Sequence, residues 1–429
     1  MIEMHKPPRH SRRNIHASII GNILEWYEFS LFAYLAPVMS RLFFPSQSPA
    51  ASLLSTLLVF AAGFFIRPLG SILLGHLGDR WGRANTLKLT IFLMSISSVL
   101  TGLLPTHHSV GILAPILLVL CRLMQGFCIG GEFAGSMIYL SESADAKQRA
   151  FISSMTNNGS NIGVLIAILS CALLSHSLGE QALADYGWRI LFVSGGVLGI
   201  IGLWLRRSLS ESDTFHELQK NIREPYSPLR YVMKTQRKKM LNIFLLLFIS
   251  ACGSYTLMGY LSTYLHEFLH VSLTKAYEMQ TIFIVISLAI LPVFARLSDK
   301  IGRKKVLLFS IGGYLIFALP SIAILPYYTS WWVMLPMVIF YSAEQAVTPV
   351  MIVEMFSGKG RYTGISLAYN LCMATAGGLS PAINTWLTQH FNNLWMMAYY
   401  IMFCALVSLW VTLRYVPDEY GVQTELTLA

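Results

Sequence analysis

Charged side chains are scarce in this sequence. They make up 12% of its 429 residues, whereas 55% of the residues are hydrophobic. A soluble globular domain carries about 25% charged residues. A chain of this length with so few polar side chains cannot cover its surface in water. An ordinary soluble protein is therefore excluded, and a membrane is the expected solvent.

Several chemical signatures are also missing. The six cysteines all fall inside apolar segments and form no CxxC pair, so neither a disulfide framework nor a zinc site is expected. A P-loop lysine motif and a nucleophile–base set are absent too, which argues against ATP-driven transport and against a membrane enzyme. The sequence therefore predicts no cofactor. The first apolar segment is too long for a signal peptide and is expected to be a retained span.

Long apolar runs are what the sequence does contain. A helix needs about 20 apolar residues to cross roughly 30 Å of hydrocarbon. Twelve segments meet this requirement, which predicts an all-α integral membrane protein with twelve transmembrane helices. The segments are 16–44, 52–77, 84–104, 110–140, 150–175, 188–206, 239–265, 276–297, 306–325, 331–356, 364–388 and 394–415.

The basic residues sort onto one side of these spans. If the spans alternate in direction, all but five of the 31 Lys and Arg residues lie on the same side of the bilayer. The positive-inside rule places that side, with both termini and the long middle loop, in the cytoplasm. This sorting accounts for the net charge of +10 without a nucleic-acid partner.

Two sequence echoes indicate a repeat. Asp79, Gly82 and Arg83 recur as Asp299, Gly302 and Arg303 at an offset of 220 positions, and the segment 142–149 recurs as 354–361 at an offset of 212. Paired repeats in a membrane chain point to a transporter whose substrate lies near the midplane between the repeats. We predict two pseudo-symmetric six-helix bundles, 1–206 and 239–415, joined by a cytoplasmic linker, 207–238, and followed by a short tail, 416–429.

The recurring loop residues are expected to form a cytoplasmic gate. An aspartate in such a loop can accept hydrogen bonds from a helix N-terminus or pair with an arginine, and breaking these contacts would open the inner side. Alternatively, the loops only fix the topology through their basic residues. The expected gate consists of Asp79, Arg83, Glu142, Arg149, Asp299, Arg303, Glu354 and Arg361, with Arg149 paired to Glu354 and Arg361 to Glu142.

Three charged residues lie at matching depths inside the membrane. Glu25 and Glu28 share one face of the first span, and Arg122 lies near the middle of the fourth. Charged groups in hydrocarbon are rarely kept without a partner or a water-filled cavity. A pair between Glu28 and Arg122 that opens when substrate binds would link substrate binding to proton binding. The alternative is a static ion pair that fastens two helices.

Further polar residues inside the spans are candidates for substrate binding. Arg67 either binds a substrate carboxylate or extends toward the cytoplasmic surface. Glu344 either neutralises a substrate ammonium or pairs with the protein's own dipoles. Tyrosines can bind a quaternary ammonium through cation–π attraction, but they are also common at membrane interfaces. The remaining candidates are Tyr255, Tyr260, Tyr369, Asn158 and Asn370.

Several motifs resemble a known family of transporters. The stretches "GHLGDRWGRANTL" (75–87) and "RLMQGFCIGGE" (122–132) resemble the loop and fourth-helix motifs of the major facilitator superfamily. A narrower set resembles the metabolite:proton symporter family, whose members include proline/betaine, 2-oxoglutarate, citrate and shikimate transporters. This set comprises "GNILEWYEF", "IRPLGS", "GWRILF", "GRYTGISLAYN" and "GGLSP". The start of the chain also resembles amino-acid transporters of intracellular bacterial pathogens.

The resemblance implies proton-coupled import of a small zwitterion or organic acid across a bacterial inner membrane by a monomer. It also implies proton coupling by Arg122. Glu28 stands where the family has aspartate, Ser357 replaces a proline, and the short tail has no heptad pattern, so osmotic sensing is not expected. The alternative is a proton-driven exporter of a small organic molecule or drug. The fifth span contains no proline, which argues against export.

Overall fold

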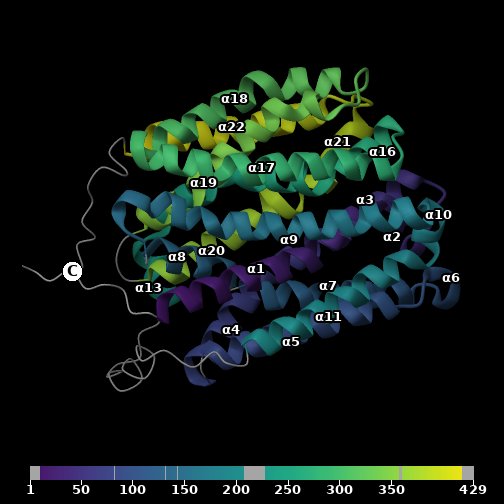
Figure 1. Cartoon of the computed structure of the whole chain (residues 1–429), viewed down its shortest axis with the longest axis horizontal. Coiled ribbons are helices and arrows are strands. Elements are labelled where there is room, and N and C mark those ends of the chain that lie inside the picture. Colours follow the sequence, from purple (N-terminus) through teal and green to yellow (C-terminus); the bar gives the residue numbers. More distant parts are fainter. Residues whose placement is uncertain are drawn as a thin grey trace, which may run out of the picture.

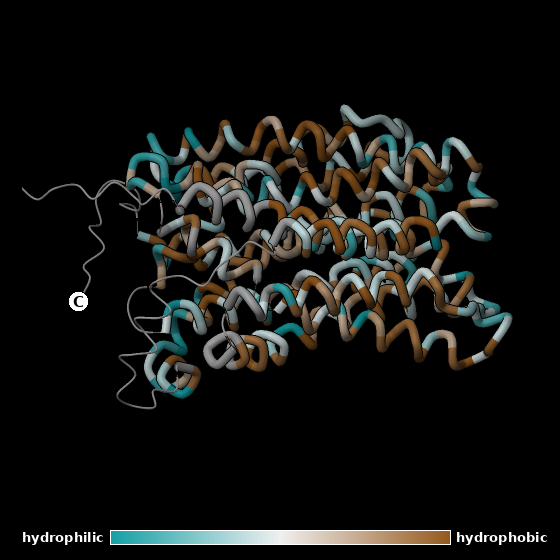
Figure 2. Tube along the Cα trace, turned by 60° about the horizontal axis from the view of Figure 1, so that its bottom comes forward, coloured by the Kyte–Doolittle hydropathy of each residue, from teal (hydrophilic) through white to brown (hydrophobic). Residues whose placement is uncertain are grey.

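The described part of the chain is built from helices joined by short connections. This computed structural model describes residues 10–81, 83–130, 132–142, 144–206, 228–356 and 360–417, and these contain no β-strand. The long helices lie side by side along the longest axis of the molecule (Figure 1). Hydrophobic residues cover most of their middle parts, and hydrophilic residues gather toward the two ends (Figure 2). This distribution is the one expected of helices that cross a bilayer.

The first half of the chain supplies six helical rods that follow the first six predicted spans. Its elements are α1 (His10–Tyr34), α2 (Ala36–Phe43), α3 (Pro49–Phe65), α4 (Arg67–Trp81), α5 (Arg83–Leu103), α6 (His107–Val110), α7 (Leu113–Ile129), α8 (Glu132–Glu142), η1 (Ala146–Gln148), α9 (Arg149–Leu178), α10 (Glu180–Ala182), η2 (Leu183–Gly187) and α11 (Trp188–Arg206). Short breaks divide the rods α1–α2, α3–α4 and α7–α8.

The second half follows the last six predicted spans. Its elements are α13 (Pro228–Thr235), α14 (Arg237–Leu246), α15 (Phe248–Gly253), η3 (Ser254–Tyr260), α16 (Leu261–Leu269), α17 (Leu273–Ile301), α18 (Arg303–Ile324), η4 (Trp331–Met334), α19 (Leu335–Met355), α20 (Arg361–Cys372), η5 (Met373–Gly378), α21 (Ser380–His390) and α22 (Met396–Tyr415). The short helix α13 lies within the segment expected to be a linker and packs against α20.

Nine helices in the described residues are long and apolar enough to cross a membrane. The other three predicted spans correspond to α1–α2, α5 and α20–α21. In α5 the apolar part is confined to Lys88–Leu103, so composition alone gives a weaker signal there. These spans are also packed against neighbouring rods. Helix α5 packs along α11, and α1 packs along α9.

The two halves meet along α9 and α17, which pack against each other over much of their length. Helices α17, α18, α19 and α22 form one side of the molecule in Figure 1, and α4, α5, α7 and α11 form the other. We call one end of the molecule the basic end, because Arg149, Lys300, Lys304, Arg361 and Arg414 lie near the helix termini there. The opposite end holds α6, α10 and the connection between α16 and α17.

Two irregular turns and a proline modify helices of the second half beside the first half. The π-helical turns η3 and η5 break the rods α15–α16 and α20–α21, and they contact each other. Pro349 lies inside α19. Such irregularities leave backbone groups without their regular partners and are frequent at functional sites.

Glycines let α7 approach α3 and α4 closely. A Cβ atom added to Gly126 would fall within 2.8 Å of the Cα atom of Gly63 and nearer still to its carbonyl group. A Cβ atom on Gly130 would lie within 2.8 Å of the backbone nitrogen of Ser71. Small residues at such positions permit the backbone contact that drives helix association in lipid.

This contact predicts that Gly126→Ala destabilises the protein, although alanine is the better helix former. The added methyl group meets backbone atoms that cannot rotate away, and such overpacking costs about 1–3 kcal/mol. The matched control is Gly312→Ala in α18, where the added Cβ atom meets nothing within 4 Å and the helix gains about 0.5–1 kcal/mol. Thermal unfolding of the detergent-purified protein measures both. Equal melting temperatures for the two variants would contradict the close contact.

Candidate transport site

A cavity lies between the two halves, roughly in the middle of the helices. Its volume is about 40 Å³, which is room for a few water molecules. Elements α1, α8 and α9 line it from the first half, and α15, η3, α19, α20 and η5 from the second. The lining residues are Trp26, Phe133, Met137, Asn157, Ser160, Asn161, Val164, Ser250, Ser254, Tyr255, Met258, Tyr341, Gln345, Thr348, Pro349, Tyr369 and Met373. We call this the central cavity.

Aromatic rings pack in pairs around the central cavity. The indole of Trp26 stacks on the ring of Tyr255 with centroids 6.2 Å apart. The ring of Phe133 stacks on that of Tyr369 at 5.2 Å. Each pair joins one residue from the first half to one from the second, so the aromatic contacts hold the cavity walls together. Tyr255 and Tyr369 thus lie where the sequence predicted cavity residues.

Glu344 lies behind the cavity wall and does not line it. Its side chain is completely buried. One carboxyl oxygen accepts a hydrogen bond from the amide of Gln345 at 3.0 Å, and the other accepts one from the hydroxyl of Thr348. Gln345 and Thr348 themselves line the cavity. In this arrangement the carboxyl group of Glu344 is paired with the dipoles of two neighbouring side chains, which is the second of the two interpretations of this residue.

An amide group from the first half crosses the cavity to α19. Asn157 Nδ2 donates a hydrogen bond of 2.8 Å to the backbone carbonyl of Gln345. Asn157 and Asn161 line the cavity, but the predicted Asn158 does not. Asn158 is one helical position further on, a rotation of about 100°, and its role in substrate binding stays a prediction. The spacing along α9 identifies the residues that line the cavity, because residues three and four positions apart share one face of a helix.

Two other predicted residues lie away from the cavity. Tyr260 is buried, and its hydroxyl group bonds to the hydroxyl of Thr385 at 2.7 Å. Asn370 Nδ2 donates to the carbonyl of Gly130 at 2.7 Å and so joins α20 to the first half. Neither lines the central cavity, so their expected place there is corrected to contacts between helices.

Two arginines are buried beside the same aromatic ring. The guanidinium of Arg67 lies 4.1 Å from the ring centre of Phe64 and 4.8 Å from that of Phe29. The guanidinium of Arg122 lies 5.0 Å from the ring centre of Phe29 and 4.1 Å from that of Phe32. Arg67 therefore neither lines the cavity nor reaches the surface. Cation–π contact in a desolvated site contributes about 2 kcal/mol and helps retain the charge.

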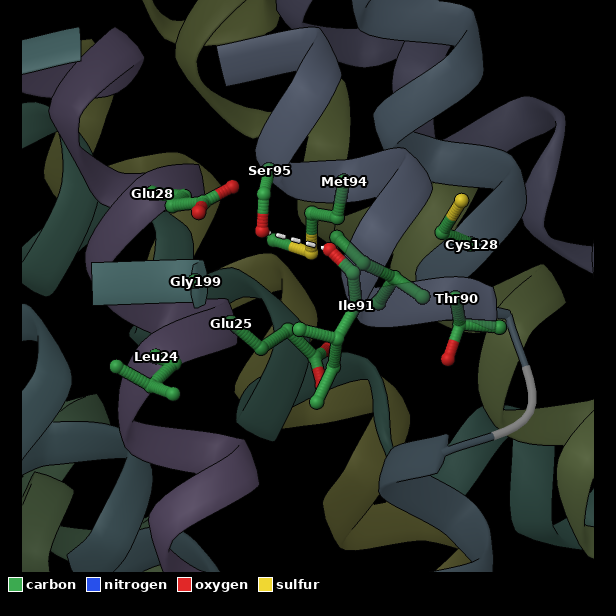
Figure 3. A pocket seen from close by; sticks show the side chains of 10 residues that line it. Leu24, Glu25, Glu28, Thr90, Ile91, Met94, Ser95, Cys128 and Gly199 are labelled. Atoms are coloured by element: carbon green, nitrogen blue, oxygen red, sulfur yellow. Dashed lines mark hydrogen bonds between the residues drawn. The ribbon is translucent and has the colours of Figure 1, made fainter. Parts of the chain in front are cut away.

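The predicted pair between Glu28 and Arg122 is not formed among the described residues. Arg122 Nη1 instead donates to Gln125 Oε1 at 2.6 Å. Glu25 and Glu28 line a separate cavity of about 20 Å³ inside the first half, together with Thr90, Ile91, Ser95 and Gly199 among others. In Figure 3 the carboxyl group of Glu28 is directed toward Ser95 of α5. The two side chains leave their helices in different directions, which keeps them apart.

A charged network joins the two halves at the basic end. Asp299 accepts hydrogen bonds from the backbone nitrogens of Ala150 and Phe151 at 3.0 and 3.1 Å, so it caps the N-terminus of α9. Arg303, fully buried, lies 3.1 Å from Asp299 and 3.5 Å from Glu354. Glu354 also lies 3.6 Å from Arg149, as the sequence predicted. Four predicted gate residues thus meet in one cluster, which we call the inner latch.

The other predicted gate residues divide into two groups. Arg361 donates from Nε to the carbonyl of Phe356 at 2.6 Å, a contact within the second half. The side chains of Asp79, Arg83 and Glu142 lie outside the described residues, so the expected pair of Arg361 with Glu142 stays a prediction.

The sequence analysis missed a second set of contacts between the halves, at the opposite end. The Tyr34 hydroxyl donates to the carbonyl of Met258 at 2.7 Å, and the Tyr277 hydroxyl donates to the carbonyl of Tyr34 at 2.8 Å. Glu180 accepts from the backbone nitrogen of Leu273 at 2.7 Å, at the N-terminus of α17. We call these contacts the outer latch. The inner and outer latches therefore hold the two halves together on either side of the central cavity.

A metal centre finds no support in this arrangement. Within the ranges that the structure describes, no group of three or more His, Cys, Asp and Glu residues is placed to hold a metal ion.

Two helical halves with a cavity between them are typical of a membrane transporter, and comparisons with known proteins identify its family. The model of the Major Facilitator Superfamily matches residues 19–340 and 243–427. The chain belongs to this superfamily. It is a multi-pass membrane transporter rather than an enzyme, and its relatives are proteins of bacteria. The resemblance inferred from the loop and fourth-helix motifs is confirmed.

Curated relatives match almost the whole chain. It is 32% identical over 410 residues to the glycine betaine/proline/ectoine/pipecolic acid transporter OusA of Dickeya dadantii, covering 93% of this chain and 82% of that protein. The same figures apply to the proline/betaine transporter of Escherichia coli strain K12. A putative proline/betaine transporter of Staphylococcus haemolyticus is 32% identical over 406 residues, covering 93% of this chain and 86% of that protein.

Solved structures show the same fold. The crystal structure of a D-xylose-proton symporter superposes with a TM-score of 0.74 at 20% identity, covering 96% of this chain and 99% of that one. A partially occluded inward-open form of the xylose transporter XylE from E. coli gives a TM-score of 0.72 at 18% identity, covering 96% and 98%. The predicted all-α membrane fold of twelve helices in two bundles is thereby confirmed.

The inner latch predicts that Arg303→Met lowers the free energy of unfolding by about 3 kcal/mol or more. The substitution leaves Asp299 and Glu354 in a buried cluster without their shared cation. The control is Lys300→Met, which removes the same charge from an exposed position of α17, where about 0.5 kcal/mol or less is expected. Melting curves of the purified variants measure both losses. Adding Glu354→Gln to Arg303→Met should recover part of the loss, and equal losses for the two single variants would contradict the network.

Proposed function

We propose that this protein imports a small zwitterion together with protons by alternating access. The observation that carries the proposal is a small polar and aromatic cavity closed at both ends by separate sets of contacts. The chain acts as a monomer, because its own two halves complete the cavity. The inner latch and both termini face the cytoplasm, which agrees with the basic residues at that end.

A net-neutral substrate suits the central cavity better than an organic acid does. Among the described residues that line the cavity, none is Asp, Glu, Lys or Arg. A net charge placed there would lose its hydration without gaining a countercharge. Amides, hydroxyls and aromatic faces can instead stabilise both ends of a zwitterion. The curated relatives are named as transporters of such molecules, among them proline and glycine betaine. The cavity must widen to accept them.

Helix α1 connects the site proposed for protons to the substrate cavity. Glu25 and Glu28 face the small cavity within the first half, and Trp26 faces the central cavity. Tyr34, near the end of the same helix, belongs to the outer latch. The small cavity has room for about one water molecule, which can exchange a proton with a carboxyl group. Because Glu28, Trp26 and Tyr34 all lie on α1, protonation of Glu28 can affect both the central cavity and the outer latch. Arg122 contributes a buried positive charge nearby.

The two latches are placed to open alternately. Asp299, near the end of α17, caps the start of α9. Glu180, just after the end of α9, caps the start of α17. Rocking one half against the other separates the helices at one end while pressing them together at the other. Each opening therefore breaks one cap and preserves the other.

Glu28→Gln is expected to abolish accumulation driven by a proton gradient but to preserve exchange. Glutamine resembles the protonated carboxyl group and cannot release a proton, so the substrate can cross but the gradient cannot drive it. Uptake of radiolabelled L-proline into proteoliposomes, with an imposed gradient and in a separate counterflow assay, measures the two activities. The control is Glu278→Gln, which changes an exposed carboxylate of α17. Undiminished accumulation by Glu28→Gln would exclude Glu28 from coupling.

Removing either cap should shift the conformational equilibrium toward the side it seals. Asp299→Ala should raise access to the cavity from the basic end, and Glu180→Ala should raise access from the opposite end. A cysteine placed at Ser160, in the cavity lining, reports access through its labelling by membrane-impermeant thiol reagents from each side. The parent protein, whose six native cysteines are buried, gives the background. A shift toward the same side by both variants would contradict the alternating latches.

A further inference from the structure

One backbone carbonyl at the central cavity lacks its regular helical partner. Pro349 lies inside α19 and carries no N–H group, so it cannot donate to the carbonyl of Gln345, four residues earlier. Both residues line the cavity. The amide of Asn157 takes the place of the missing donor at 2.8 Å. A carbonyl oxygen has two lone pairs, so it can accept a second hydrogen bond from a ligand.

The groups around this carbonyl favour a cationic donor. Glu344, one residue earlier, is fully buried directly behind the wall. Its carboxyl group holds the side chains of Gln345 and Thr348 in place. Gln345 Nε2 also lies 2.9 Å from the hydroxyl oxygen of Ser254. The wall formed by α19 therefore presents a fixed acceptor oxygen with a carboxyl group close behind it, which suits the N–H of an ammonium group.

The aromatic residues are poorly arranged for an ammonium group without N–H. A cage for a quaternary ammonium needs several ring faces open toward one space. Here Trp26 and Tyr255 cover each other's faces, and so do Phe133 and Tyr369. Each stack therefore covers one face of both its rings, which reduces the ring surface open to a cation.

We propose that the Gln345 carbonyl released by Pro349 is the ammonium subsite, and that it selects zwitterions with at least one N–H over fully N-methylated betaines. This inference rests on the proposed import of a zwitterion. A substrate N–H donates to this carbonyl beside or in place of the Asn157 amide. This competition weakens the hydrogen bond by which Asn157 joins the two halves. A quaternary ammonium offers no donor, so opening that contact to admit it leaves the carbonyl unsatisfied. A site built to bond an N–H discriminates strongly against a ligand that lacks one.

A series of ligands with one ring and increasing N-methylation tests the inference. L-proline, N-methyl-L-proline and N,N-dimethyl-L-proline keep the carboxylate and the ring, while the number of N–H groups on the cationic nitrogen falls from two to one to none. Inhibition of L-proline counterflow in proteoliposomes of the full chain measures their relative affinities. The first methyl group should change the affinity little, and the second should lower it by about tenfold or more.

The variant Pro349→Ala tests the carbonyl itself. Alanine restores the N–H, which occupies the carbonyl of Gln345 from within the helix, and it suits a helix better than proline does. The preference for N-methyl-L-proline over the dimethylated ligand should fall toward unity. Pro292→Ala is the matched control, because Pro292 lies inside α17 and does not line the cavity. It should keep the preference of the parent protein.

The outcomes separate the two proposals. Counterflow with equal affinities across the series would overturn the ammonium subsite and leave zwitterion import standing. An unchanged preference in a folded Pro349→Ala variant would also overturn the subsite. The absence of counterflow with every member, together with no thermal stabilisation by any of them, would remove both proposals.

Discussion

The antiparallel contact between α9 and α17 is the interaction on which the other contacts between the halves depend. Each helix begins where the other ends, so the acidic residue near one C-terminus reaches the free N–H groups of its neighbour. An unsatisfied helix start is costly in a membrane, and a carboxylate both accepts its hydrogen bonds and interacts favourably with the helix dipole. Because the two caps lie at opposite ends of this contact, the closed form is held at both ends, with the central cavity beside α9 between them.

The central cavity beside this contact is lined in part by irregular backbone of the second half. The turns η3 and η5 and the proline of α19 adjoin the cavity. By contrast, the contact of α7 with α3 and α4 leaves no space for even one methyl group at Gly126. The first half is therefore packed closely where α7 meets α3 and α4, whereas the second half presents its irregular turns to the central cavity. This division agrees with transport by motion of nearly rigid halves around a local site.

Much of this architecture could be predicted from the sequence, because it follows from length, hydropathy and repetition. Apolar length predicted the helical rods, and the repeat offset predicted that Arg149 meets Glu354. Rotation about a helix axis was harder to predict. It separates Asn157 from Asn158 and turns the side chain of Glu28 away from that of Arg122. Contacts such as that of Tyr34 with the carbonyl of Met258 leave almost no sequence signal, because every residue carries a carbonyl group.

The hydrogen bond between Asn157 and the Gln345 carbonyl has a consequence for the energetics of the unloaded protein. Its donor and acceptor satisfy each other across the interface between the halves, and the aromatic rings of the cavity wall stack in pairs. The halves can therefore close at this point with neither group of that hydrogen bond left unsatisfied. A carrier that returns empty at little energetic penalty concentrates its solute inside the cell, whereas one that must be loaded in both directions only trades one molecule for another.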